Sequence, residues 1–152
     1  MPKIDTTRLP TRKSSTYPDA FKPVCEGREK TALGNGAELT QFGVNLTRIK
    51  PGSASALRHW HENEDEFVYM LAGELVLIED GGETIMRPGD CAGFKAGVSN
   101  GHHLVNRSDR DALYLEIGSR SPVERAHYPD DDLFIERDEQ QVRILHKSGE
   151  PY

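Results

Sequence analysis

Long apolar runs are absent from this chain of 152 residues, and no hydrophobic stretch approaches the length needed to cross a bilayer. The N-terminal stretch MPKIDTTRLPTRKSSTYPDAF has no apolar core, so we expect no secretory signal peptide. Cysteine is also scarce, because Cys25 and Cys91 are the only two and neither belongs to a CxxC pair. Two such residues do not make a disulfide framework. We therefore expect both cysteines to be free thiols, and we expect Cys91 to pack as a small apolar residue. With no signal peptide and no membrane span expected, the predicted location is cytoplasmic.

A surplus of positive charge is missing as well. The chain has 19 Lys and Arg against 25 Asp and Glu, which gives a formal net charge of -6. Nucleic-acid binding depends largely on cationic contacts with phosphate, and binding to an anionic membrane surface needs basic residues. The composition therefore argues against both nucleic acid and membrane as partners.

Helical periodicity is absent between residues 38 and 120. Short apolar runs such as EFVYML, ELVLIED and ALYLEIG alternate there with turns such as DGG and PGD, a pattern typical of an all-β sandwich or barrel. Residues 1–37, rich in Pro, Lys, Arg, Ser and Thr, predict an extended N-terminal arm that lies on the barrel core or on a partner subunit. Residues 121–152 predict a C-terminal extension that packs on the barrel, with FIER and VRILHK as candidate strands and an acidic, solvated loop at residues 130–132.

Two histidines one residue apart occur in the segment ALRHWH. Side chains alternate along a strand, so His59 and His61 point to the same face, whereas on a helix residues two apart diverge. Two imidazoles on one strand face can share a single ion at about 2.1 Å each. The same pattern is also common on protein surfaces, so further ligands are needed before it favours a metal site.

Glu66 is the carboxylate expected to complete this pair. The polar sequence ENED reads as a short turn, and the strand EFVYML that follows it should return antiparallel to ALRHWH. That pairing places Glu66 near His61, with Val68 and Met70 forming an apolar lining on the same face. The acidic residues of the turn, Glu62, Glu64 and Asp65, are expected to be solvated.

A third nitrogen ligand is expected from the segment HHLVN. Alternation puts His102, Leu104 and Asn106 on one face and His103 on the other, so only one of the two histidines can look inward. We select His102 and keep His103 as the alternative. The predicted metal ligands are therefore His59, His61, Glu66 and His102.

At these residues the chain resembles the cupin superfamily. The first cupin motif is Gly, five or six residues, HxH, three or four residues, Glu, six residues and Gly, and it is matched from Gly52 to Gly73. The second motif, with PxG followed by His and Asn, is matched less closely from Gly89 to Asn106. Lys95 stands where the motif has Pro, and four residues rather than two separate the glycine from the histidine. The flanking segments resemble those of small single-domain cupins of undefined function.

The resemblance implies a double-stranded β-helix, or jelly-roll barrel, with three histidines and one glutamate around a divalent ion at the barrel mouth. The ion implied is Fe, Mn, Ni or Zn, and mixed nitrogen and oxygen ligands do not select among them. Cupins of this size are commonly homodimers, so a homodimer is expected.

Two classes of function follow from this resemblance. The first is a metal-dependent enzyme that acts on a small oxygenated substrate, of the dioxygenase, isomerase, lyase or decarboxylase type, with sugar-phosphate isomerases included. A phosphate substrate needs inward-facing cations; of the candidates Arg48, Lys50 and Arg58, Arg58 alternates with His59 and should face away, which weakens that version. The second class is a non-catalytic cupin that binds or senses a small molecule and holds a structural metal. No catalytic base or nucleophile outside the metal set is identified.

Overall fold

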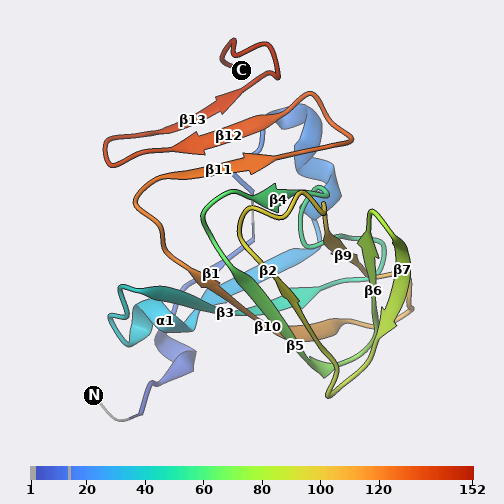
Figure 1. Cartoon of the computed structure of the whole chain (residues 1–152). Coiled ribbons are helices and arrows are strands. Elements are labelled where there is room, and N and C mark those ends of the chain that lie inside the picture. The colour runs from blue at the N-terminus through green and yellow to red at the C-terminus, as the bar shows by residue number, and fades with distance from the viewer. Residues whose placement is uncertain (1–2, 14) are drawn as a thin grey trace.

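Two facing walls of antiparallel strands form a barrel in the computed structural model, which describes residues 3–13 and 15–152 (Figure 1). The first wall is a six-stranded sheet in the order β1-β2-β3-β10-β5-β8. Its strands are β1 (Thr11–Arg12), β2 (Arg28–Ala32), β3 (Phe42–Ile49), β10 (Ala112–Ser119), β5 (Glu66–Ala72) and β8 (Cys91–Phe94).

The second wall consists of two smaller sheets. One sheet has the order β7-β6-β9 and the other β13-β12-β11-β4. The isolated bridges Ala54↔Val105 and His59↔His102 join the segment before β4 to the β9 segment, which closes the gap between the two sheets. The strands are β4 (Trp60–His61), β6 (Leu75–Glu79), β7 (Gly82–Met86), β9 (His103–Val105), β11 (Glu124–His127), β12 (Phe134–Arg137) and β13 (Val142–Leu145). The jelly-roll barrel expected from the sequence is confirmed.

Helical structure is confined to short segments near the N-terminus of the described chain. These are the 3-10 helices η1 (Thr6–Arg8) and η2 (Asp19–Cys25) and the single helical turn α1 (Leu33–Gly36). No helix in residues 3–13 and 15–152 is long and apolar enough to cross a membrane. The assigned elements of residues 38–120 are all strands, as the lack of helical periodicity predicted.

The main core fills the space between the two walls. Along β5 the inward Val68 and Met70 are buried, whereas the alternating outward Phe67, Tyr69 and Leu71 are about two-fifths exposed. This alternation is what a strand with one buried face requires. The other members of the core come from β3, β6, β7, β9 and β10: Ile49, Leu75, Leu77, Met86, Leu104, Ala112 and Tyr114.

A second apolar cluster joins the two ends of the chain. Tyr17 and Cys25 of the N-terminal segment pack with Ala126, Tyr128 and Leu133 of the C-terminal segment. Figure 1 shows η2 beside β11 and β12, above the mouth of the barrel. Within residues 1–37 the strand β2 pairs with β3 and so extends the first wall. The boundaries at residues 37 and 120 stay predictions.

The sequence interpretation of Cys91 is wrong. Cys91 is exposed on β8, at the edge of the first wall, whereas Cys25 is buried in the second cluster. Side chains of β8 alternate, and the inward positions belong to Ala92 and Phe94, which pack against the main core. The register of β8, which local sequence does not reveal, therefore decides which residue is covered.

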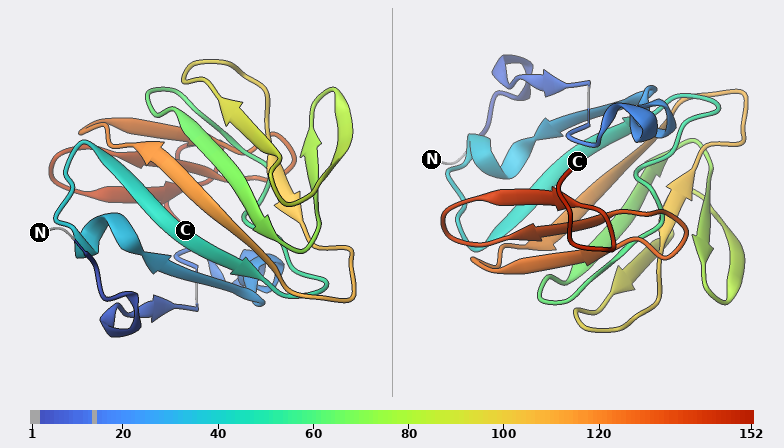
Figure 2. Two further views of the ribbon diagram at one scale, coloured as in Figure 1. Left: turned by 90° about the horizontal axis from the view of Figure 1, so that it is seen from below. Right: turned by 90° about the horizontal axis from the view of Figure 1, so that it is seen from above.

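The expected hairpin between residues 59–61 and β5 is also wrong. β4 pairs with β11, with Ala126 opposite His61, whereas β5 pairs with β10 and β8. The ENED segment is therefore a corner that carries the chain from the second wall to the first (Figure 2). A polar sequence of this length fits both a hairpin turn and such a corner, and only the pairing of distant strands separates them.

Candidate metal centre

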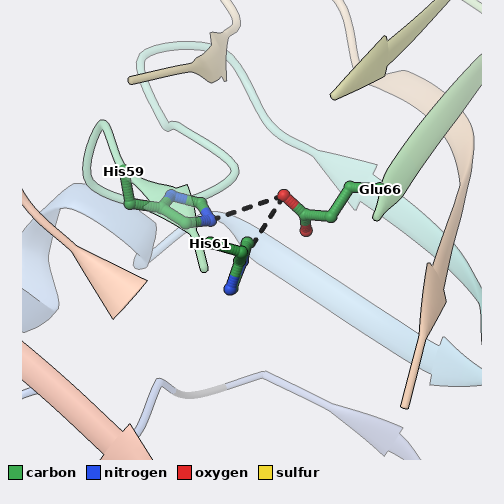
Figure 3. A group of neighbouring side chains, drawn as sticks. All are labelled: His59, His61 and Glu66. Carbon is green, nitrogen blue, oxygen red and sulfur yellow. Dashed lines mark ion pairs between the residues drawn. The ribbon is translucent and has the colours of Figure 1, made fainter. Parts of the chain in front are cut away.

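Three histidine side chains converge on one carboxylate inside the barrel. The Nε2 atoms of His59, His61 and His102 lie 3.7, 3.4 and 2.7 Å from Oε2 of Glu66. Figure 3 shows His59 and His61 entering from one side and Glu66 from the opposite side. The four residues that the sequence singled out are thus brought together, with Glu66 reaching across the barrel instead of along a hairpin.

The other ring nitrogen of each histidine faces an oxygen atom. His59 Nδ1 lies 2.7 Å from the carbonyl oxygen of Leu57, and His102 Nδ1 lies 3.3 Å from that of Asn100. A carbonyl only accepts, so Nδ1 of these rings carries the proton and donates it. In a neutral ring protonated at Nδ1, Nε2 is free to offer its lone pair to a metal ion, as a metal ligand requires.

His61 is oriented by a carboxylate that the sequence did not reveal. Glu124, on β11, is 5% exposed, and its Oε1 lies 3.5 Å from His61 Nδ1. This separation is long for a hydrogen bond, and we treat the contact as an ion pair. Glu124 is itself held by backbone N–H groups of Glu62, Asn63 and Arg125, which donate to its two oxygens. The local sequence around residue 124 does not predict the contact with His61, because this contact depends on the pairing of β11 with β4.

The charges of the cluster are strongly coupled. Burial lowers the pKa of His59 to about 4. Burial opposes protonation of His61 too, but Glu124 and Glu66 outweigh it and raise its pKa to about 10. For Glu66 burial works to raise the pKa, and the hydrogen bonds from His102 and His61 hold it well below its usual range. Without an ion, the raised pKa of His61 places one positive charge between the carboxylates of Glu66 and Glu124, and a bound divalent cation would take over this role.

The donor set fits a divalent metal ion. Two ligand atoms at about 2.1 Å from one ion and at right angles lie about 3 Å apart, which is close to the separations of the Nε2 atoms from Glu66 Oε2. Ligand atoms of His59, His61 and Glu66 all lie within 4.8 Å of one another. The three neutral imidazoles and one carboxylate are ligands that Fe, Mn, Ni and Zn all accept.

His103, the alternative third histidine, is directed elsewhere. Its Nδ1 lies 2.9 Å from the carbonyl oxygen of Ala56, whereas His102 contacts Glu66. The two additional residues of the second motif do not displace His102. They lie in a loop anchored by Asn100, which accepts from Asp80 N and donates to Glu79.

Glu62 and Glu64, expected to be solvated, are both engaged. Glu62 Oε1 accepts from His127 Nε2 at 2.7 Å. Glu64 accepts from the backbone of Ser121 and from Arg137, and it joins His61 and Glu124 in a second group of possible ligand atoms. Asp65 is exposed, as expected. The corner between the walls thus ties the barrel to the C-terminal extension.

The residues expected as a solvated acidic loop, 130–132, are tied to other segments. Asp130 receives two hydrogen bonds from Arg58, and Asp132 Oδ2 lies 2.7 Å from His146 Nδ1. Arg58 points away from the histidines, as alternation predicted. The acidic loop therefore fastens the C-terminal extension to the barrel.

The cluster of His59, His61, Glu66 and His102 opens into a cavity of about 380 Å³. This volume lies within the range of about 300–1,000 Å³ that small-molecule sites occupy. Apolar Val68 and Leu104 line it together with the hydroxyl-bearing Tyr17 and Tyr128. Burial raises the pKa of Tyr17 to about 12, so its hydroxyl is protonated at neutral pH. An adjoining cavity of about 500 Å³ shares Glu66 with it.

Basic side chains line the 380 Å³ cavity beside the histidines, but they are not the arginine and lysine residues that the sequence suggested as phosphate ligands. Arg48 is on the outward face of β3, where it pairs with Asp111, and Arg58 is turned toward Asp130. The cavity is lined instead by Arg12, Arg28, Lys30 and Arg137. Arg28 and Lys30 are two residues apart in REKTA, so on a strand they would point to the same face. This signal was missed because β2 lies in the range that was interpreted as an extended arm.

Comparisons with known proteins show the family of this chain. The family model described as Cupin domain matches residues 45–118. A Silicibacter pomeroyi DSS-3 structure described as a sugar phosphate isomerase from a cupin superfamily is 44% identical, with a TM-score of 0.96, and the match covers 99% of this chain and 96% of that one. An Acidithiobacillus ferrooxidans ATCC 23270 protein, proposed to be a sugar phosphate isomerase, is 27% identical with a TM-score of 0.76 over 82% of this chain and 80% of that one. A Thermotoga maritima oxalate-binding protein is 32% identical over 88 residues, which are 58% of this chain and 67% of that protein.

Proposed function

This chain belongs to the cupin superfamily, and we propose that it is a metal-dependent enzyme whose substrate is a small sugar phosphate that it isomerises. His59, His61, Glu66 and His102 are the proposed ligands of one divalent ion, of Fe, Mn, Ni or Zn type. Relatives of this chain are described as a sugar phosphate isomerase and as an oxalate-binding protein.

The convergence of three histidine Nε2 atoms on Glu66 is the observation that carries the proposal. The cluster lies in a cavity that also presents cations, and this combination suits a substrate with both neighbouring oxygens and a negative charge. The similarity to the Silicibacter pomeroyi protein supports the isomerase class, because it covers nearly all of both chains.

A bound divalent ion supplies Lewis acidity, which polarises the carbonyl or hydroxyl oxygens of a substrate. The residues of this chain do the remaining work. Val68, Leu104 and Phe94 line the cavity and exclude water from part of it. The protonated hydroxyls of Tyr17 and Tyr128 line the same cavity and are available to donate hydrogen bonds to substrate oxygens.

Isomerisation also requires a group that removes a proton from one carbon and returns it to the next. Glu116 is the candidate, since it and Glu66 are the carboxylates among the described residues that line the cavity. It accepts hydrogen bonds from Lys30 at 2.7 Å and from Asn45 at 3.1 Å, which hold it in place. Glu116→Gln is expected to lower kcat about 100-fold or more and to leave the metal content unchanged.

The proposal is tested first by elemental analysis of the full chain purified without added metal or affinity tag. About one Fe, Mn, Ni or Zn per chain is expected. The same preparation is then assayed with a panel of aldose and ketose phosphates, with the His59→Ala/His61→Ala double variant as the inactive control. A protein that takes up no metal, or a metal-loaded protein that converts no member of the panel, would contradict the enzyme proposal.

A second candidate function rests on the Thermotoga maritima relative, which is described as oxalate-binding. In that case the cavity binds a small dicarboxylate, and the metal either promotes decarboxylation or only holds the ligand. Oxalate that binds without turnover, together with no isomerase activity, would favour a non-catalytic binding module. Release of carbon dioxide would favour a decarboxylase.

We also propose a homodimer formed through the outer face of the first wall. Phe67, Tyr69 and Leu71 on this face of β5 are 39%, 40% and 40% exposed, and a second copy would cover them. Tyr69→Lys is expected to convert the dimer to a monomer, as measured by light scattering after gel filtration. A wild-type chain that runs as a monomer would contradict the proposal.

The unpaired Cys25 and Cys91 support the proposed cytoplasmic location.

A further inference from the structure

We propose that Arg28, together with Arg12 and Ser15, forms a subsite that binds the phosphate group of the substrate on the N-terminal side of the cavity. This inference rests on the proposed function, because it names the part of the substrate that the metal ligands do not hold. All three residues line the same cavity as His59, His61, Glu66 and His102. They lie outside both motifs, in the N-terminal segment that completes the first wall.

Arg28 is a buried cation without a matching carboxylate. It is 7% exposed, and its side chain enters the barrel from β2, opposite the buried Ile49 of β3. Its Nη1 donates to the carbonyl oxygen of Ser55 at 2.5 Å, and no Asp or Glu in the described part of the chain lies within ion-pair distance of it. A buried charge is costly unless it is paired, so Arg28 favours an anion in the cavity.

Ser15 adds an unsatisfied hydroxyl to the same cavity. Its Oγ is buried and has no hydrogen-bond partner among residues 3–13 and 15–152. Buried polar groups in native proteins are nearly always bonded, so such an exception points to a missing partner. An oxyanion accepts hydrogen bonds from a hydroxyl and from a guanidinium alike.

The balance of charge around the cavity leaves two cations free. Lys30 pairs with Glu116, and Arg137 pairs with Glu64. Arg12 and Arg28 have no such partner within the described residues, and Glu66 is committed to the metal ligands. Two guanidinium groups and a hydroxyl match the several oxygens and the double negative charge of a phosphate monoester better than a single carboxylate.

The test measures the binding of inorganic phosphate to the metal-loaded full chain by calorimetry, with metal content determined for every variant. Arg28→Met is expected to weaken phosphate binding about 10- to 100-fold, and Arg12→Gln and Ser15→Ala are expected to weaken it by smaller factors. Arg110→Gln, an exposed arginine outside the cavity, is the matched control and is expected to bind phosphate as the wild type does.

Unchanged phosphate affinity in a folded, metal-loaded Arg28→Met variant would overturn the subsite. If the Arg28→Met variant does not fold, the phosphate affinities of Arg12→Gln and Ser15→Ala test the subsite instead. Wild-type affinity in both of these variants would overturn the subsite. Acetate or oxalate that binds as tightly as phosphate and with the same dependence on Arg28 would reassign the subsite to a carboxylate and reject the phosphate proposal. A chain that binds no metal but shows Arg28-dependent phosphate binding would sink the proposed function and leave the subsite standing.

Discussion

His61 and Glu66 stand on opposite walls of the barrel, and their side chains meet with His61 Nε2 3.4 Å from Glu66 Oε2. The corner that joins them is short, so the two residues are close in the sequence although they belong to different sheets. A single ion between them would therefore link the two walls. This relationship underlies the first prediction.

Glu66→Gln is expected to weaken metal binding more than about 100-fold, because the carboxylate is the only anionic member of the proposed ligand set. Glu64→Gln is the matched control, because Glu64 belongs to the alternative group with His61 and Glu124. Its side chain is engaged with Arg137 and Ser121, so a small effect on metal affinity is expected. Competition with a chelator of known affinity gives both values. Equal losses in the two variants would show that the wrong acid was assigned.

Glu124→Gln is expected to lower metal affinity about 10- to 100-fold through the orientation of His61. The single amide oxygen of Gln can still accept from one of the backbone N–H groups of Glu62 and Asn63, so the corner keeps one of these two hydrogen bonds and loses the other. Glu62→Gln changes a neighbouring carboxylate that contacts His127 and no proposed ligand, and it is expected to leave the affinity unchanged. Chelator competition is combined with thermal unfolding of the metal-free proteins. A Glu124→Gln variant that loses stability but keeps full metal affinity would reduce Glu124 to a structural role.

Gly73→Ala is expected to destabilise the fold by about 1–3 kcal/mol. Gly73 ends the first motif with a φ of 73°, and an added Cβ would lie 2.5 Å from the carbonyl oxygen of Asp111. Gly81→Ala is the control, since an added Cβ there meets nothing within 4 Å. It should change the free energy of unfolding by no more than about 0.5 kcal/mol. Denaturant titration measures both variants, and a similar loss in the two would contradict the steric argument.

Asp130→Asn is expected to reduce stability at neutral pH by no more than about 1 kcal/mol, because Asp130 is 59% exposed and solvent screens its pair with Arg58. The hydrogen bonds from Arg58 lower the pKa of Asp130 below 3.8. The stabilisation is therefore present above the unfolded pKa and is lost as the pH falls through the lower folded pKa. The difference in Tm between wild type and variant should vanish once the pH lies below the folded pKa of Asp130. A difference that persists there would contradict an electrostatic origin, and Glu139→Gln controls for the loss of an exposed charge.

Several elements of the site were predictable because they depend on short-range geometry. Strand alternation put His59 and His61 on one face, and the same alternation in HHLVN separated His102 from His103. Both inferences hold in the structure, where His102 lies 2.7 Å from Glu66 and His103 bonds to the backbone of Ala56. Gly73 was located by its place at the end of the first motif, and its φ of 73° is a local reason for a glycine at that position.

Other elements depended on contacts between distant segments. The interpretation of ENED as a hairpin turn failed because β4 pairs with β11, more than 60 residues away, instead of with β5. Glu124 and Arg28 were missed for the same reason, since Glu124 reaches His61 through the pairing of β11 with β4, and Arg28 reaches the cavity through the pairing of β2 with β3. The exposure of Cys91 likewise follows from the edge position and register of β8.

The sequence by itself determined the all-β class, the shared face of His59 and His61 and the opposite faces of His102 and His103, because side-chain direction along a strand repeats every two residues. The structure then selected His102, which contacts Glu66. The tertiary structure decided that Glu66 approaches from the opposite wall, that Glu124 orients His61, and that Arg12 and Arg28 line the cavity. Those facts arise from strand pairs that are remote in the chain, and local periodicity carries no information about which remote strands pair.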